Sequence, residues 1–346
     1  MREDSLYRKS SDEPDRVAVC VTTFHRPEGL ERMLRSLEKL TFRSEPVPDV
    51  RVIVVDNAPE ERIAVQVVSR LPGYRFALDC VGEPRIGLVY ARNKGVKVAL
   101  RSRATWIAFL DDDEIVRPAW LGEMLAAARS FRADVVAGPV VPFFEVAPPP
   151  WILRGRFFDR PRPATGTKLP TTRGGNVLVS TKILAGAPGP FDSDLAHTHG
   201  EDTLLFAQLA SRGASIVWAD EGIVDDWVPP ARTTVAWLLR RSFIGGNTWP
   251  LVESKLSPGR SQGLVRAGKG ISHILWGAAM LVPASLVGRH AVVRCAMKMW
   301  LGAGMLSALL GNQVRTYGNG KAQECPADLA AETLELDQDG RTVSAR

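Results

Sequence analysis

The sequence predicts an α/β fold in which helices flank a mostly parallel, mixed sheet. The first observation is that short apolar, β-rich segments alternate with stretches of helical spacing from residue 17 to residue 141. The second is the composition: of 346 residues, 45% are apolar and 24% are charged, as in a soluble globular protein with a sizeable core. This composition excludes disordered, collagen-like and disulfide-scaffold proteins, and no repeat of solenoid length is present.

The predicted strands follow one another through the first two-thirds of the chain. They span residues 17–23, 50–56, 75–81, 105–111, 134–141, 176–180 and 215–219. Helical spacing fills the intervals between the first five, at residues 27–40, 59–70, 87–101 and 117–131. In a sheet built this way, ligands bind beyond the carboxyl ends of the strands. Residues 142–174 are rich in Pro, Gly and Arg and predict a long irregular segment, which is usually functional or mobile.

Charge is distributed unevenly along the chain, whose net charge is +6. Residues 231–300 contain ten Lys or Arg and a single acid, Glu253, whereas residues 321–346 contain three basic and six acidic residues. A basic stretch of this kind faces nucleic acid, anionic lipid or phosphorylated substrates. We divide the chain into a disordered tail (1–16), an α/β domain (17–245), a basic, apolar helical region (246–312) and an acidic tail (313–346).

Two apolar runs in the helical region predict contact with a membrane. Residues 270–288 carry no charge, and residues 291–310 are interrupted by Arg294 and Lys298, four residues apart on one helical face. The favoured interpretation is an interfacial helix pair whose basic stripe faces anionic headgroups. Packing of both helices on the α/β domain and a true membrane span are the alternatives.

Cysteine usage and the N-terminus bear on the compartment. The four cysteines are widely spaced and form no CxxC pair, which excludes a zinc ribbon or a redox motif and favours a reduced, cytosolic compartment. The N-terminus has no apolar segment, so no signal peptide is expected.

Four consecutive acids, Asp111-Asp112-Asp113-Glu114, end the apolar run at 105–111 and are the strongest local signal. Adjacent carboxylates repel and require a compensating cation or abundant solvent. A divalent metal with hard oxygen ligands supplies that charge and bridges to phosphates of a substrate. The alternative is a solvated acidic turn that caps the next helix.

Two further signals lie at the ends of predicted elements. Asp56 ends the strand at 50–56, where an Asp accepts hydrogen bonds from a base or a ribose, or else caps the next helix. Arg92 lies early in a predicted helix, where it either faces a phosphate or is an ordinary surface arginine.

Glu201 and Asp202 open the helical run at 203–213. Acids at a helix start are often only caps, but a carboxylate beside a cleft can act as a general base. His197 and His199 have the spacing of metal ligands on a strand, but the sequence offers no third nitrogen or sulfur ligand nearby.

Six short motifs occur in a recognisable order. They are Thr22-Thr23-Phe24-His25-Arg26-Pro27, Val55-Asp56-Asn57, Gly87-Leu88 with Ala91-Arg92-Asn93-Gly95, Phe109-Leu110 with the acidic run, Gly174-Gly175-Asn176, and Gly200-Glu201-Asp202. In this order the chain resembles the inverting family 2 glycosyltransferases with the GT-A fold, and among them the exopolysaccharide enzymes of the succinoglycan type. The resemblance covers about residues 17–245 and implies that this α/β domain is the catalytic domain.

The resemblance implies a role for each matching residue. Thr22 and Asp56 contact uridine, and Arg92 lies near the phosphates of the donor. Asp111, Asp112 and Asp113 form the family's DxD motif, in which Asp111 approaches the ribose or sugar and Asp113 binds Mn²⁺ or Mg²⁺, with Asp111 as a second metal contact. Asp202 is the catalytic base, with Glu201 beside it. Arg240 and Arg241, in a block that follows Asp226-Trp227-Val228-Pro229 and Arg232, complete the donor-binding set.

The implied reaction is the inverting transfer of one sugar from a UDP-sugar, with UDP-glucose the best choice, to a lipid-linked or polysaccharide acceptor. The chain has no QxxRW motif, since residues 239–243 are Leu-Arg-Arg-Ser-Phe, so addition of a single sugar is favoured over processive polymerisation. The implied location is the cytoplasmic face of the inner membrane, on an anionic lipid surface and without a nucleic-acid partner.

Three rival functions fit the sequence less well. A sugar-nucleotide nucleotidyltransferase needs a glycine-rich loop after the first strand, where this chain has Thr-Thr-Phe-His-Arg-Pro. A dinucleotide oxidoreductase needs GxGxxG at the same place. A non-catalytic membrane scaffold needs none of the acids that occupy the catalytic positions.

Overall fold

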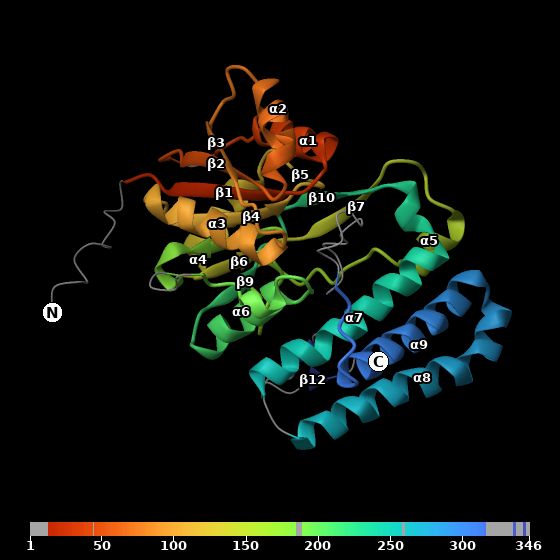
Figure 1. Ribbon diagram of the computed structural model, residues 1–346. Helices are drawn as coiled ribbons and strands as arrows, with labels where there is room; N and C mark the ends of the chain where they lie inside the picture. Colours follow the sequence, from red (N-terminus) through yellow and green to blue (C-terminus); the bar gives the residue numbers. More distant parts are fainter. Residues whose placement is uncertain are drawn as a thin grey trace.

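The computed structural model describes residues 13–43, 45–184, 189–257 and 260–315, together with two short paired strands nearer the C-terminus. A seven-stranded sheet lies at the centre, in the order β3-β2-β1-β4-β8-β6-β9 (Figure 1). Its strands are β1 (Arg16–Thr23), β2 (Asp49–Asp56), β3 (Ala77–Gly82), β4 (Trp106–Asp111), β6 (Val135–Ala137), β8 (Val177–Ser180) and β9 (Ile216–Trp218). Strands β1 to β4 are parallel and β8 is antiparallel to β4 and β6. The predicted mixed, mostly parallel sheet is therefore confirmed.

A second sheet has the order β5-β10-β7. Strand β10 (Val224–Val228) pairs antiparallel with β5 (Glu114–Val116) and parallel with β7 (Val140–Phe144). The sequence predicts neither β5 nor β10, because β5 has only three residues and two adjacent acids interrupt the apolar pattern of β10. A short ladder also joins β11 (Glu335–Leu336) to β12 (Thr342–Val343).

Helices cover both faces of the large sheet, as the alternation predicts. Helices α1 (Pro27–Leu37), α2 (Ile63–Ser69) and α4 (Trp120–Ser130) share one buried cluster with Val17, Val19 and Val21 of β1. Helices α3 (Leu88–Arg101) and α6 (Glu201–Ser211) share the other with Ala18 and Cys20. Successive β1 side chains thus enter opposite cores, as the pleat of a strand buried on both faces requires. The shorter helices are α5 (Pro150–Gly155), η1 (Pro59–Glu61), η2 (Thr181–Ile183), η3 (Ser193–Leu195) and η4 (Pro230–Thr233).

The segment predicted as one strand at 134–141 is two strands. Residues 135–137 form β6 in the large sheet, and residues 140–144 form β7 in the small one. Pro139 separates them, and because it has no N–H it cannot continue the ladder. The apolar composition is continuous across this point, so the change of sheet leaves no mark in the hydrophobic pattern.

The predicted N-terminal tail is shorter than residues 1–16. Asp15 is buried, accepts a hydrogen bond from the Trp106 indole at 3.3 Å and pairs with Arg129 at 2.5 Å. Strand β1 begins at Arg16, so residues 15 and 16 belong to the domain. Residues 1–12 and most of the predicted acidic tail lie outside the described residues.

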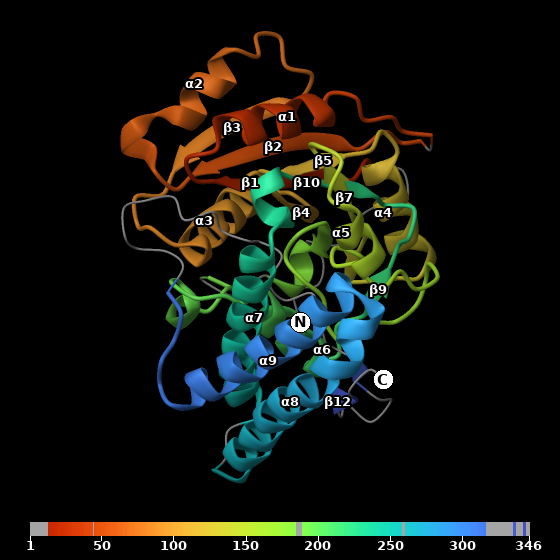
Figure 2. The same cartoon turned by 90° about the vertical axis from the view of Figure 1, so that its right-hand side faces the viewer.

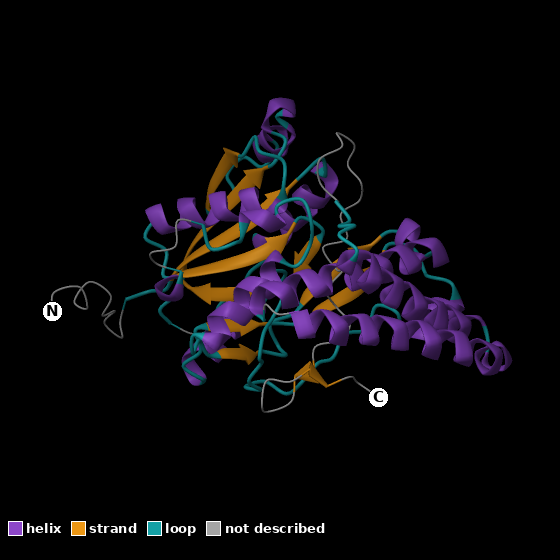
Figure 3. Cartoon of the chain, turned by 60° about the horizontal axis from the view of Figure 1, so that its bottom comes forward, coloured by secondary structure: helices purple, strands orange, loops and turns teal. Residues whose placement is uncertain are grey.

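Three long helices follow the catalytic domain: α7 (Val235–Leu256), α8 (Arg260–Val287) and α9 (Arg289–Leu309). They lie together beside the sheet, with α9 against both α7 and α8 and with α8 outermost (Figures 1, 2 and 3). A Cβ atom at Gly302 would collide with the Gly270 carbonyl of α8, and one at Gly304 with the Phe243 carbonyl of α7. Backbones approach this closely only through glycine. The domain boundary predicted at residue 245 falls within α7.

Two of these helices are long and apolar enough to cross a membrane, judged by length and composition alone. They are Gly263–Val287, with a mean hydropathy of 1.6 and 17% of the residues buried, and Arg289–Leu309, with a mean hydropathy of 1.2 and 39% buried. Association with a membrane is thus weakly supported. The more apolar helix is also the more exposed one.

The predicted basic stripe of α9 is wrong for Arg294. Its guanidinium donates to the Gly155 carbonyl of α5 and lies 5.9 Å from the Phe157 ring centroid. Arg289 lies over the Trp151 ring at 4.6 Å. These arginines attach α9 to the catalytic domain because aromatic faces and a helix-terminal carbonyl are available on α5.

Asn176 joins both sheets at the start of β8. It is fully buried, accepts from the Trp120 indole at 2.6 Å and donates to the carbonyls of Pro139 and Gly222 at 2.8 and 2.7 Å. Its φ is 49°, a left-handed conformation that Asn tolerates better than most residues. One side chain therefore satisfies three buried polar groups at the junction of α4, β6–β7 and β9–β10.

We predict that Asn176→Ala lowers the free energy of unfolding by about 3 kcal/mol, because it leaves an indole N–H and two carbonyls buried without partners. Urea denaturation followed by circular dichroism measures the change. The control is Gln66→Ala on exposed α2, for which a change within about 0.5 kcal/mol is expected. Equal effects of the two substitutions would show that this network contributes little.

Candidate active site

The four consecutive acids lie at the point where the sheet changes direction. Strands β2 and β3 lie on one side of β1 and β4 lies on the other, so the carboxyl ends of β1 and β4 flank the topological switch point, where open α/β sheets bind ligands. Asp111, the last residue of β4, is in register with Thr22 of β1. Asp111, Asp112, Asp113 and Glu114 are all buried, with at most 8% of their surface exposed. The predicted position of the acidic run is confirmed.

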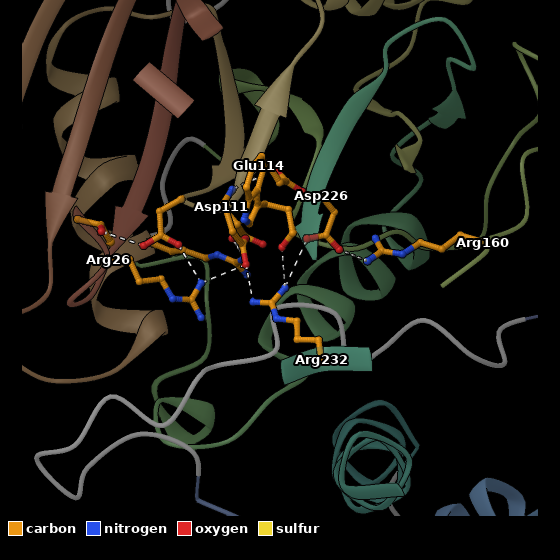
Figure 4. A network of polar contacts seen from close by, with 11 residues as sticks. Arg26, Asp111, Glu114, Arg160, Asp226 and Arg232 are labelled. Atoms are coloured by element: carbon orange, nitrogen blue, oxygen red, sulfur yellow. Dashed lines mark hydrogen bonds and ion pairs between the residues drawn. The ribbon is translucent and has the colours of Figure 1, made fainter. Parts of the chain in front are cut away.

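Arginines from distant parts of the chain hold the acidic run (Figure 4). Arg26, in the loop after β1, donates to Asp112 Oδ1 at 3.0 Å and to Asp113 Oδ2 at 3.1 Å. Arg232, in η4, donates to the same Oδ2 of Asp113 at 2.7 Å and lies 3.5 Å from Asp226 of β10. Arg160 lies 3.9 Å from the other oxygen of Asp226. Two guanidiniums thus share one carboxylate oxygen.

Arg92 connects the acidic run to the acids of α6. Its side chain is 4% exposed and donates to Glu201 at 2.6 Å and to Asp111 at 3.3 Å, with Asp202 at 4.0 Å. A Cβ atom at Gly174 would collide with this guanidinium, and one at Gly175 would lie 2.7 Å from Glu114 Oε1. The Gly-Gly pair lets the loop before β8 cover the buried ions without displacing them.

Among the described contacts of this network, seven carboxylates and four guanidiniums take part. The carboxylates are those of Asp111, Asp112, Asp113, Glu114, Glu201, Asp202 and Asp226, and the guanidiniums are those of Arg26, Arg92, Arg160 and Arg232. Burial raises the pKa of Asp112 and, together with the Asp111 carboxylate, raises the pKa of Glu114 well above its usual range. Excess negative charge that burial makes costly is what a bound cation relieves.

Glu201 and Asp202 lie in different environments. Burial, with the neighbouring Asp202 carboxylate, raises the pKa of Glu201 to about 7, although Arg92 is in contact with it. Three carboxylates share that one guanidinium, which weakens its effect on each of them. Asp202 accepts from the Gly174 N–H at 2.7 Å and from the Thr203 N–H at 2.6 Å, and its side chain is 13% exposed against 4% for Glu201. Asp202 is therefore the more accessible of the two.

His197 and His199 lie just before this pair. Burial lowers the pKa of His199 to about 4, with a smaller contribution from Arg92, so its imidazole is neutral at physiological pH. His197 packs edge-on against Tyr90 at 6.4 Å between ring centroids. Within the described ranges, no three His, Cys, Asp or Glu side chains are arranged to hold a metal ion by themselves.

The predicted nucleotide-binding residues lie on the same edge of the sheet. Thr22 is near the end of β1, and the neighbouring Thr23 donates to Asp112 at 2.8 Å. Asp56 is buried at the end of β2 and accepts from the N–H groups of Ala58 at 2.9 Å and Ala64 at 3.3 Å. Its carboxylate thus organises the start of α2, the capping alternative noted above, and contact with uridine stays a prediction.

Arg240 and Arg241 lie on α7. Arg241 packs over the Trp237 and Phe158 rings at 5.2 and 5.9 Å, and Arg240 is exposed. The arginine of this block that enters the acidic network is Arg232, before α7 begins. Donor binding by Arg240 and Arg241 stays a prediction.

Five residues of the network had no role assigned from sequence: Arg26, Glu114, Arg160, Asp226 and Arg232. Arg26 lies directly after the first strand and Glu114 ends the acidic run. Their positions in the sequence could therefore have identified both as candidate site residues. Arg160 lies within an irregular segment, and no local pattern distinguishes it. Asp226 and Arg232 are visible only through the resemblance.

A sheet of this topology with strand-end carboxylates at its switch point defines a GT-A glycosyltransferase, which binds a nucleotide-sugar. Comparison with known proteins agrees: Glycosyl transferase family 2 matches residues 18–185. The chain is 31% identical over 308 residues to succinoglycan biosynthesis protein ExoM of Rhizobium meliloti (strain 1021). The match covers 87% of this chain and 96% of that protein. The chain belongs to glycosyl transferase family 2.

The fold agrees with that of a solved structure. The mannosyltransferase PcManGT from Pyrobaculum calidifontis, in complex with GDP-Man and Mn²⁺, superposes with a TM-score of 0.54 at 18% identity, over 89% of this chain and 92% of that one. S. aureus TarS 1-349 in complex with UDP gives a TM-score of 0.49 at 14% identity, over 94% and 98% of the two chains.

The raised pKa of Glu201 predicts a pH dependence of stability. Its usual value of 4.5 rises to about 7 in the fold, so the folded state binds this proton more tightly than the unfolded state does. The contribution is complete below the unfolded pKa and is lost as the pH rises through the folded one. Relative to Glu201→Gln, the wild type should lose about 2–3 kcal/mol of stability between about pH 5 and pH 8.

Urea denaturation of both proteins across this pH range measures the difference. Glu60→Gln, on exposed η1, is the matched control and should follow the wild type. Parallel curves for wild type and Glu201→Gln would show that Glu201 is ionised throughout.

Proposed function

We propose that this glycosyltransferase transfers a single sugar, with inversion, from a UDP-sugar to a hydroxyl of a lipid-linked or polysaccharide acceptor in exopolysaccharide synthesis. The observation that carries the proposal is the division of the buried carboxylates into two groups that Arg92 connects. One group lies at the end of β4, where a donor diphosphate would bind, and the other opens α6. The relative from Rhizobium meliloti is named as a succinoglycan biosynthesis protein, which supports a polysaccharide product.

The donor site fits Mn²⁺ or Mg²⁺. Mg²⁺ is commonly bound through one or two carboxylates together with the phosphates of a substrate. Asp113 and Asp111 supply such carboxylates beside an excess of negative charge. When bound, the ion would stabilise the charge that develops on the leaving diphosphate. Uridine, rather than another base, follows from the resemblance, as does glucose.

Asp202 is the proposed general base. It must accept a proton from the acceptor hydroxyl as that oxygen attacks the anomeric carbon. Two backbone N–H groups donate to its carboxylate, which fixes the direction in which it points. Glu201 is not the proposed base, because its carboxylate is paired with Arg92 at 2.6 Å. Asp202 is thus the more exposed carboxylate of the group that opens α6.

We predict that Asp202→Asn reduces transfer on the order of 100-fold, because the base acts in the chemical step. UDP affinity in the presence of Mn²⁺ should stay unchanged, because the base contacts the acceptor. Radiolabelled UDP-sugars with a bacterial lipid extract measure transfer, and calorimetry measures binding. Asp225→Asn, paired with Arg117 outside the network, is the control. A variant that keeps more than about a third of the activity would exclude Asp202 as the base.

Helix α8 is the proposed site of attachment to the membrane. A line of exposed apolar side chains runs along it at alternating spacings of seven and four residues, which places them on one helical face. They are Leu264, Ile271, Leu275, Val282 and Leu286, with exposures of 79, 48, 64, 75 and 88%. Every one of these side chains is turned away from α9 and the catalytic domain far enough to meet solvent or lipid.

The charges around α8 favour an anionic lipid surface as its partner. Residues 254–323 contain no Asp or Glu and nine Lys or Arg. An apolar helical face within a purely basic segment is typical of interfacial attachment. The cytoplasmic face of the inner membrane is anionic and would present a lipid-linked acceptor to the site.

We predict that Leu275→Glu combined with Val282→Glu reduces binding to vesicles containing phosphatidylglycerol by at least about tenfold. Vesicle flotation measures the bound fraction. Val65→Glu, an exposed apolar position on α2, is the control and should bind as the wild type does. A wild-type protein that ignores vesicles, or a double variant that dimerises less without any change in vesicle binding, would contradict the assignment.

A further inference from the structure

Two arginines from distant parts of the chain donate hydrogen bonds to one oxygen of Asp113. Arg26 reaches Asp113 Oδ2 at 3.1 Å from the loop after β1, and Arg232 reaches the same atom at 2.7 Å from η4. The Asp113 side chain is 10% exposed and that of Arg232 is 4% exposed. Charge-assisted hydrogen bonds of this length are strong. The two guanidiniums therefore compensate the negative charge of the Asp113 carboxylate before any ligand binds.

The proposed metal needs the same carboxylate. A divalent cation bound to Asp113 repels the two guanidiniums on its Oδ2, so the ion and the arginines compete for one carboxylate. This repulsion favours the departure of one arginine from Asp113 when the ion binds. This step rests on the function proposed above, in which Asp113 is a metal ligand.

The contacts indicate which arginine leaves. Arg26 also donates to Asp112 at 3.0 Å through the same nitrogen, so it keeps a carboxylate partner when Asp113 is taken. The contacts of Arg232 with Asp226 and with the Trp227 carbonyl are both 3.5 Å long, at the limit of a hydrogen bond. Of these three contacts, the one with Asp113 is the shortest, and it is the one that the metal would oppose.

We propose that Arg232 exchanges partners during donor binding: it holds Asp113 in the metal-free enzyme and moves to the donor diphosphate when the metal takes Asp113. The guanidinium lies on Asp113, the proposed metal ligand. A short side-chain movement would therefore bring it to donor phosphates bound beside that residue. Arg is suited to both partners, because its planar fork pairs with carboxylate and phosphate alike. Arg232 is thus both a competitor of the metal and a ligand of the nucleotide.

This exchange couples the two ligands. The apparent affinity for the metal is reduced by the fraction of enzyme in which the arginine occupies Asp113. Binding of the diphosphate removes that competitor, and linkage requires that metal and nucleotide strengthen each other by the same factor. Removing the guanidinium should therefore change the two affinities in opposite directions.

The test measures both affinities with the full chain. Arg232→Gln should raise the affinity for Mn²⁺ alone about tenfold, measured by electron paramagnetic resonance. The same variant should lower the affinity for UDP at saturating Mn²⁺ about tenfold, measured by calorimetry. Because Arg232 is buried, Arg232→Lys is measured beside it. It keeps a positive charge without the planar fork, and the same two directions are expected with smaller changes.

Two substitutions serve as comparisons. Arg26→Gln should raise the affinity for Mn²⁺ alone but change the UDP affinity by less than about threefold, because Arg26 stays with Asp112 in both states. Arg117→Gln, an exposed arginine paired with Asp225 at 2.8 Å on the other face of β10, should change neither. If Arg26→Gln lowers the UDP affinity and Arg232→Gln does not, the exchange is assigned to the wrong arginine and the proposal fails.

The outcome separates this inference from the proposed function. If Mn²⁺ binds the wild type and Asp113→Asn abolishes that binding, the metal site stands. Unchanged affinities in Arg232→Gln would then overturn the exchange alone. If Mn²⁺ does not bind the wild type even with UDP, the metal-dependent function fails and the exchange fails with it.

Discussion

A single buried guanidinium, that of Arg92, connects the two acidic groups on which the proposed chemistry depends. It contacts Asp111 at the end of β4 and Glu201 at the start of α6, elements that are 90 residues apart in sequence. Without this ion pair the two groups would repel across the crevice. The loop before β8 also depends on Arg92, because a side chain larger than that of glycine at Gly174 would collide with the guanidinium. The positions of donor group, base group and loop therefore follow from one interaction.

Periodicity predicted most of the large sheet because its strands are short, largely apolar runs, even where Arg51 enters β2 and Asp79 enters β3. It failed where an element is defined by its partner rather than by its own pattern. Strand β10 is a strand because β5 and β7 lie on either side of it, and its acids have other partners. The division at Pro139 escaped for the opposite reason, since both halves are apolar and only the geometry of the proline separates them.

Most carboxylates of the site could be predicted, and most of its arginines could not. Acids gather in short runs at strand ends, so Asp111 to Glu114 are adjacent in sequence as well as in space. Arg26, Arg160 and Arg232 come from three separate connections, and each is one arginine among many in a basic chain. Nothing in the local sequence distinguishes an arginine that enters a buried network from one that lies over an aromatic ring, as Arg241 does.

The segment from β10 to α8 links the proposed site to the proposed membrane surface. Asp226 and Arg232 flank the end of β10, and α7 begins at Val235, capped by the Thr234 hydroxyl. Helix α7 packs along α9, which in turn supports α8 and is fixed to α5 through Arg294. A lipid surface that holds α8 would thus set the position of the helix that starts just after Arg232. The acceptor and the donor ligands would then be placed by one continuous stretch of chain, which gives the long helices a part in the geometry of transfer beyond attachment.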